Sequence, residues 1–160
     1  MSYLELISKI GIDKNTPSKL AKKIVVFNQL LTFSAVISLF FVLIYIPLGE
    51  YFFAFFSFIP IVIALIGLFL NSRNSYAIAS FGVILAYGIC IFLLSSIGGE
   101  ESNFHYLLIP LISCIVFLFQ DEKFKMLSGI FISIFIYVVL VGTEFSLFLI
   151  YRPSKDLLKI

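Results

Sequence analysis

Few polar side chains in this sequence have the type and spacing that chemistry requires, and most of them lie in one short segment. The stretch GGEESNFHY contains the single histidine of the chain. His105 follows Glu101 by four residues, so one helical turn would bring an imidazole and a carboxylate together as a cation or proton sensor. The candidate sensing residues are Glu100, Glu101, Asn103, His105 and Tyr106. The competing interpretation is that these side chains are simply hydrated in an external loop.

The sequence offers little for metal binding or catalysis. One histidine with flexible carboxylates specifies a metal poorly, so we expect no metal site and no cofactor. Cys90 and Cys114 lie in apolar runs without CxxC or Cys/His spacing, and we interpret them as small hydrophobic residues. HExxH, GxSxG, P-loop and GxGxxG motifs are all missing from the sequence. We therefore predict that this chain holds no enzyme active site and no catalytic residue.

The composition of the chain indicates whether water or lipid surrounds its secondary-structure elements. The chain of 160 residues is 61% hydrophobic and 12% charged, with a mean hydropathy of +1.14. Such a chain cannot present the polar surface of a soluble globule, so a bilayer must solvate most of it. The net charge of +2 is too small to indicate nucleic acid as a partner. We predict an all-α, polytopic transmembrane helix bundle whose first partner is the lipid bilayer.

The apolar runs predict about five spans, at residues 24–47, 51–70, 75–97, 104–120 and 124–143. Residues 1–23 form an N-terminal segment that is either a short interfacial helix ended near Gly11 or a solvated tail. Thr16 and Pro17 are expected to be the N-cap and first residue of the first spanning helix. Glu144 ends the fifth span, because an ionised carboxylate is costly in lipid, so residues 145–151 become an aromatic interfacial segment and 152–160 a polar tail.

Two groups of residues are expected to pack helices together. Small residues recur at steps of four, three, four and four along the third span, which permits close approach of a neighbouring helix in lipid. This stripe consists of Ser75, Ala79, Gly82, Ala86 and Cys90. It predicts either a central helix of the bundle or a dimer contact through Gly82 and Ala86. Asn28 and Gln29, near the start of the first span, are expected to hydrogen-bond to a neighbouring helix.

The distribution of Lys and Arg predicts the orientation. Residues 1–23 contain five lysines, the connection after the second span contains Arg73, and the connection after the fourth contains Lys123 and Lys125. The two alternate connections contain none, which places the N-terminus in the cytoplasm. Three cations in the tail, at positions 152, 155 and 159, then lie on the wrong side. Either a sixth span should follow, or the fifth does not cross fully and the tail is cytoplasmic.

Three segments carry a resemblance to a known group of proteins. The sequences KLAKKIVVFNQ, GGEESNFHYLLIPL and FQDEKFK resemble the N-terminal six-span membrane domain of bacterial signalling proteins. In that group the domain precedes a class III adenylate cyclase, a sensor histidine kinase or a serine phosphatase. The resemblance implies a bacterial inner-membrane protein in signal transduction, with a sixth span and an effector that this sequence does not contain. Asn28, Gln29 and residues 100–106 lie on the similar segments.

These observations lead to one expected function and two alternatives. We expect a membrane-embedded sensory or anchoring domain, with a homodimer or another membrane protein as partner, in which a stimulus shifts the population of two helix packings. The first alternative is a small transport or permeability protein, which would need a polar path that the apolar spans do not offer. The second is a structural membrane subunit without a ligand.

Overall fold

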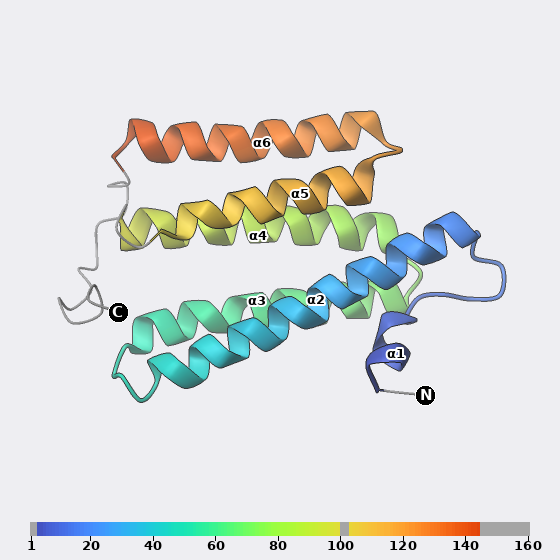
Figure 1. The fold of residues 1–160 in the computed structure, drawn as a ribbon, viewed down its shortest axis with the longest axis horizontal. Helices are drawn as coiled ribbons and strands as arrows, with labels where there is room; N and C mark the ends of the chain where they lie inside the picture. Colours follow the sequence, from blue (N-terminus) through green and yellow to red (C-terminus); the bar gives the residue numbers. More distant parts are fainter. Residues whose placement is uncertain (1–2, 100–102, 145–160) are drawn as a thin grey trace. The chain divides into compact units, whose positions relative to one another are not determined.

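The computed structural model describes residues 3–99 and 103–144, and every regular element within these ranges is a helix (Figure 1). The elements are α1 (Tyr3–Ser8), α2 (Ser18–Tyr45), α3 (Tyr51–Ser72), α4 (Tyr76–Gly98), η2 (Phe104–Leu107), α5 (Leu108–Phe119) and α6 (Lys123–Gly142). The predicted all-α fold class is confirmed. Glu100, Glu101, the expected interfacial segment 145–151 and the expected tail 152–160 lie outside the described residues.

Four of the helices are long and apolar enough to cross a membrane. They are α2, α3, α4 and α6, and their most apolar windows have mean hydropathies between 2.0 and 2.7. Only 17 to 39% of each window is buried within the chain, so most of these apolar faces are exposed. Apolar surface on this scale requires a lipid environment, which agrees with the predicted transmembrane architecture.

The fourth apolar segment is shorter than the others. It consists of the 3₁₀ turn η2 followed by α5, and together they cover Phe104–Phe119. With rises of about 2.0 and 1.5 Å per residue, this segment is about 26 Å long, against about 30 Å for a typical hydrocarbon core. Pro110 lies in the first turn of α5, where the missing N–H group would have no partner in the helix. The chain therefore combines four helices of full spanning length with one shorter apolar helix within its described residues.

The start of α2 differs from the expectation. Pro17, not Thr16, occupies the N-cap position, and no side chain caps the helix there. The Thr16 hydroxyl donates instead to the Asp13 carboxylate at 2.8 Å and accepts from the Asp13 N–H at 3.0 Å. Thr16 thus closes the preceding loop, because Asp13 offers both a donor and an acceptor only three residues away.

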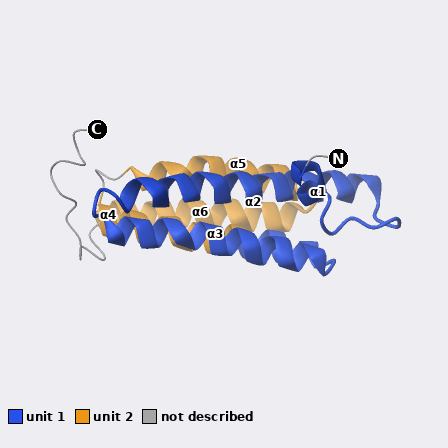
Figure 2. Cartoon of the chain, turned by 90° about the horizontal axis from the view of Figure 1, so that it is seen from below, with its two compact units in different colours: residues 1–83 blue, residues 84–160 orange. Residues whose placement is uncertain are grey.

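The chain divides into two compact units, residues 1–83 and residues 84–160 (Figure 2). In the first unit, α2 and α3 lie side by side and run antiparallel after a short turn, and α1 packs against α2. The Phe27 and Tyr76 rings meet edge to face at 5.7 Å. In the second unit, α5 and α6 pack together, and a Cβ atom added to Gly129 would lie 2.9 Å from Ile115.

The stripe of small residues that begins at Ser75 and continues along α4 is only partly buried. Ala79 and Cys90 are buried, Ser75 and Ala86 are half-buried, and Gly82 is exposed with nothing within 4 Å of an added Cβ atom. Within the chain the stripe is therefore open at Gly82, and both expected roles, a central helix or a dimer contact through Gly82 and Ala86, stay predictions. The tight helix contact in the first unit lies instead at Gly67 of α3, where an added Cβ atom would be 2.8 Å from Leu31 and 2.9 Å from Val83.

This contrast between two glycines can be tested by the same substitution at both. Gly67→Leu should lower the free energy of unfolding by about 1–3 kcal/mol, because the new side chain enters space already filled by Leu31 and Val83. Gly82→Leu, at an open helical position, is the matched control and should not destabilise the chain. Unfolding of the purified protein in detergent, followed by helical circular dichroism, measures both. Equal destabilisation by the two substitutions would contradict the packing of α3 described above.

Candidate functional site

The most elaborate polar arrangement in the described chain joins α1 to α2 through Asn28. This side chain is fully buried. Its amide nitrogen donates to the carbonyl oxygens of Ile10 at 2.9 Å, Ser8 at 3.2 Å and Ile7 at 3.3 Å. The last carbonyl groups of a helix have no partners within it, and here a side chain from another helix supplies the donor. Asn28 therefore caps the C-terminal end of α1.

The side-chain oxygen of Asn28 accepts a hydrogen bond from α3. Asn71, in the last turn of α3, donates from its amide nitrogen to the Asn28 side-chain oxygen at 2.6 Å. Both side chains are almost completely buried, at 0% and 1% exposure. Buried amides of this kind are strongly held, because breaking the pair would leave polar groups without partners in an apolar region. Three helices are thus linked by two asparagines at one end of the first unit.

A glycine allows the chain after α1 to approach this pair closely. Gly11 has a φ angle of +83°, which favours glycine over residues with a Cβ atom. A Cβ atom at this position would lie 2.4 Å from the backbone oxygen of Asn71 and 2.9 Å from its carbonyl carbon. Gly11 therefore satisfies two requirements at once, a left-handed backbone and contact with the end of α3.

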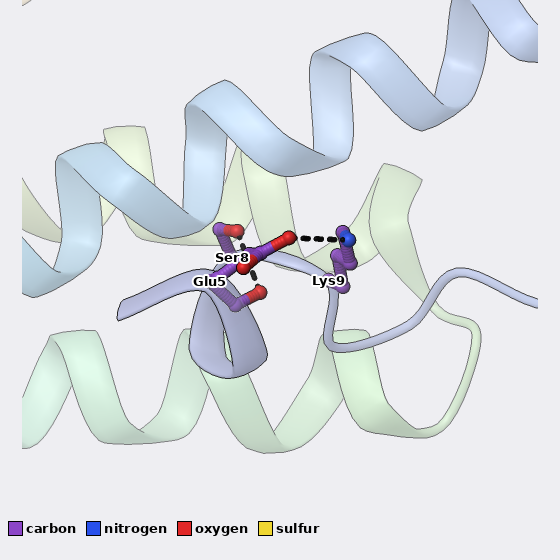
Figure 3. A network of polar contacts seen from close by, with 3 residues as sticks. All are labelled: Glu5, Ser8 and Lys9. Atoms are coloured by element: carbon purple, nitrogen blue, oxygen red, sulfur yellow. Dashed lines mark hydrogen bonds and ion pairs between the residues drawn. The ribbon is translucent and has the colours of Figure 1, made fainter. Parts of the chain in front are cut away.

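The exposed side of α1 carries its own polar contacts, shown in Figure 3. The Lys9 ammonium lies 3.0 Å from the Glu5 carboxylate, and the Ser8 hydroxyl donates to the Glu5 carbonyl oxygen at 2.9 Å. Ser8 is buried, whereas the charged ends of Glu5 and Lys9 are about half-exposed. The short helix thus presents a charged pair on its surface and a hydrogen-bonded end toward α2.

The two amides singled out from the sequence lie in different surroundings. Asn28 makes hydrogen bonds to neighbouring helices, whereas Gln29 is exposed on the surface of α2. Reasoning from sequence missed Asn71 and the close approach of Gly11, since both were assigned only to turns or helix ends. The signal that could have revealed them is the presence of polar or glycine residues at the same membrane boundary as Asn28.

The predicted sensing cluster is only partly described. His105, in η2, is buried at 7% exposure, and its ring lies 4.2 Å from the ring of Tyr106 and 6.4 Å from that of Tyr137. Tyr106 is exposed, and Asn103 has a left-handed backbone with φ of 58°. His105 is therefore packed among aromatic rings and is not a hydrated loop residue. Its predicted pairing with Glu101 stays a prediction.

Within residues 3–99 and 103–144, no three His, Cys, Asp or Glu side chains lie together in a way that could hold a metal ion. The arrangement around Asn28 consists of amide and carbonyl groups, which bind and orient but do not transfer protons readily. The hydrogen bonds of Asn28 can therefore hold α1 in place.

No protein-family model matches this chain, and neither a curated protein nor a solved structure is significantly similar to it.

Removal of the Asn28 amide should release α1. Asn28→Leu keeps the number and branching of the side-chain heavy atoms but removes the donor to three carbonyl groups, so docking of α1 should weaken by about 1–3 kcal/mol. Hydrogen exchange at the amides of residues 6–12 should become correspondingly faster. Gln29→Leu is the control, because the exposed neighbouring amide makes no contact with α1 carbonyls and should leave exchange there unchanged. Unaltered exchange in Asn28→Leu would exclude a capping role.

A second pair of substitutions tests the approach of Gly11 to α3. Gly11→Ala and Gly49→Ala both place a Cβ atom on a left-handed backbone, which costs about 1–2 kcal/mol. Only the Gly11 variant also meets the carbonyl group of Asn71, whereas Gly49 has nothing within 4 Å. Gly11→Ala should therefore lower the thermal midpoint and the protection of α1 more than Gly49→Ala. Identical effects of the two substitutions would show that this contact is unimportant.

Proposed function

We propose that this chain is a membrane-embedded sensory or anchoring domain of a bacterial signal-transduction protein. The observation that carries the proposal is the linkage of α1 to both α2 and α3 through Asn28 and Asn71. A change in the packing of α2 against α3 would alter the 2.6 Å bond between the two amides and, through it, the support of α1. A stimulus in the membrane would in this way reach a helix at the membrane surface.

The attachment of α1 has the features of an element with two accessible states. Tyr3, Leu4 and Leu6 are mostly exposed, so α1 is held chiefly by its capped end and contributes little apolar surface to the core. When α1 separates from α2, water at the membrane surface could hydrate the carbonyl groups that Asn28 had bound. This hydration lowers the free energy needed to release α1. Docked and released states would then differ by a few kcal/mol, a gap that differential binding or membrane stress can shift.

The proposed orientation puts α1 in the cytoplasm. The lysines of residues 1–23, Arg73, Lys123 and Lys125 all belong to the same side of the predicted topology, and positive residues favour the cytoplasmic side. The Arg73 guanidinium lies 5.5 Å from the centre of the Phe69 ring at the end of α3, an arrangement suited to the membrane boundary. The proposed location is the bacterial inner membrane.

The proposal assigns no catalysis to this chain. Its role would be to hold or regulate another protein or domain, with a second copy or a different membrane protein as partner. Gly82, exposed on α4 with open space beside it, offers one position where another helix could approach closely.

Distance measurements between spin labels test the proposed repacking. Labels at Leu6→Cys and Ser72→Cys, both exposed positions, would report on α1 relative to the end of α3 after Cys90 and Cys114 are replaced by Ala. In lipid nanodiscs, we expect two distance populations whose ratio changes with the acyl-chain length of the lipids. Introducing Asn28→Leu should move the distribution toward the longer distance.

Two results would contradict this function. One is a single distance that stays the same in every bilayer and in the Asn28→Leu background. The other is labelling of a Lys14→Cys variant from outside intact cells, which would place α1 on the wrong side for a cytoplasmic effector.

A further inference from the structure

An open groove lies between α1 and the side of α2 that faces it. Its volume is about 710 Å³, within the range of about 300–1,000 Å³ that is typical of small-molecule sites. It is lined by Leu4, Glu5 and Ser8 of α1 and by Val26, Gln29, Leu30, Thr32, Phe33 and Val36 of α2. Its polar lining residues come from both helices, Glu5 and Ser8 from α1 and Gln29 and Thr32 from α2, and the other lining residues are apolar.

The length of the groove corresponds to one leaflet of a bilayer. From Val26 to Val36 the axis of α2 advances about 15 Å, which is half of a hydrocarbon core of about 30 Å. Leu30, Phe33 and Val36 lie successively along this path. An acyl chain that enters beside α1 would therefore lie against apolar side chains for the depth of its own leaflet.

The polar end of the groove contains one charged group. The hydroxyls of Ser8 and Thr32 already donate to the carbonyl oxygens of Glu5 and Asn28, at 2.9 and 2.8 Å. The Gln29 amide is the other exposed polar group of the lining, so the half-exposed Glu5 carboxylate is the charged acceptor that the lining offers, and the Lys9 ammonium lies beside it at 3.0 Å. A carboxylate next to an ammonium group matches a headgroup that carries both signs of charge.

We propose that this groove binds a phospholipid with a primary-amine headgroup of the ethanolamine type. One acyl chain would lie along Leu30, Phe33 and Val36, while the headgroup ammonium would donate to Glu5 and the phosphate would face Lys9. An anionic headgroup without an amine would meet the Glu5 carboxylate unfavourably. A choline headgroup has no N–H donor for it, and hydrogen bonds between charged groups are the stronger ones. This site does not depend on the sensory role proposed above.

Lipid retention by the purified full chain tests the site. The protein in mild detergent would be offered equal amounts of ethanolamine, choline and glycerol phospholipids with identical acyl chains, and bound lipid would be counted by native mass spectrometry. We expect the ethanolamine lipid to be retained preferentially. Leu30→Trp should abolish retention by filling the groove, whereas Leu43→Trp, at an exposed apolar position of α2 outside it, should not.

A second substitution separates the headgroup contact from the acyl-chain contact. Glu5→Gln should reduce the preference for ethanolamine over choline lipid by about three- to fivefold, the effect expected for a partly exposed charged pair. Glu122→Gln is the matched control, since that carboxylate pairs with Lys125 in the second unit. If Leu30→Trp fails to fold, Val36→Trp carries the same expectation of lost retention.

Several outcomes would overturn the proposal. Equal retention of the three headgroups, a preference for the anionic lipid, or unchanged retention after the groove is filled would each exclude it. So would protection of the groove by a second copy of the chain, detected by crosslinking from a Gln29→Cys variant.

Discussion

Carbonyl groups at the end of a helix need donors, and at a membrane boundary those donors must come from water or from protein. In this chain the Asn28 amide provides them for α1, and Asn71 holds that amide from the other side. The rest of the N-terminal region follows from this requirement. α1 can be short because its C-terminal end is capped, and Gly11 must be a glycine because the chain passes so close to α3. Even the groove beside α1 exists because the helix is fixed at this height on α2.

The same bonds explain how a helix with little buried apolar surface can stay in place. In lipid, apolar side chains gain nothing by leaving the bilayer for a helix interface, so packing of small residues and hydrogen bonds decide which helices associate. The first unit uses both, with Gly67 against Leu31 in its interior and the asparagine pair at its end. The second unit relies on close packing of Gly129 against Ile115. Close packing and hydrogen bonding therefore act at separate positions, the first at Gly67 and Gly129 and the second at the asparagine pair.

The sequence predicted where the helices lie but not which side of each helix contacts a neighbour, for a physical reason. Long apolar runs bounded by charges are sufficient to locate spans, and α2, α3, α4 and α6 lie close to their expected ranges. A helix that is apolar on all sides carries no pattern that shows which face meets a neighbour. Asn28 and Gln29 are adjacent in sequence but about 100° apart around the axis, so only one of them could be buried against α1 and α3. The exposure of Gly82 on α4 could not be predicted for the same reason.

The burial of His105 was not predictable for a different reason. The polar run before it indicated a loop, but η2 begins directly after Asn103 and turns the imidazole toward Tyr137. Likewise, Asn71 lies just beyond the expected second span at residues 51–70, although α3 continues through Ser72. α3 thus extends two residues beyond its expected span, whereas η2 begins where the fourth span was expected, and both Asn71 and His105 are buried.

The short segment Phe104–Phe119 has a consequence for the membrane itself. If it crosses the bilayer upright, its length of about 26 Å leaves a hydrophobic mismatch of about 4 Å with an average bilayer. Such a mismatch costs a fraction of a kcal/mol per Å and is relieved when the surrounding lipid thins. The longer helices α2 and α4 have no such need. A bilayer of changing thickness would therefore act unequally on different helices of one chain.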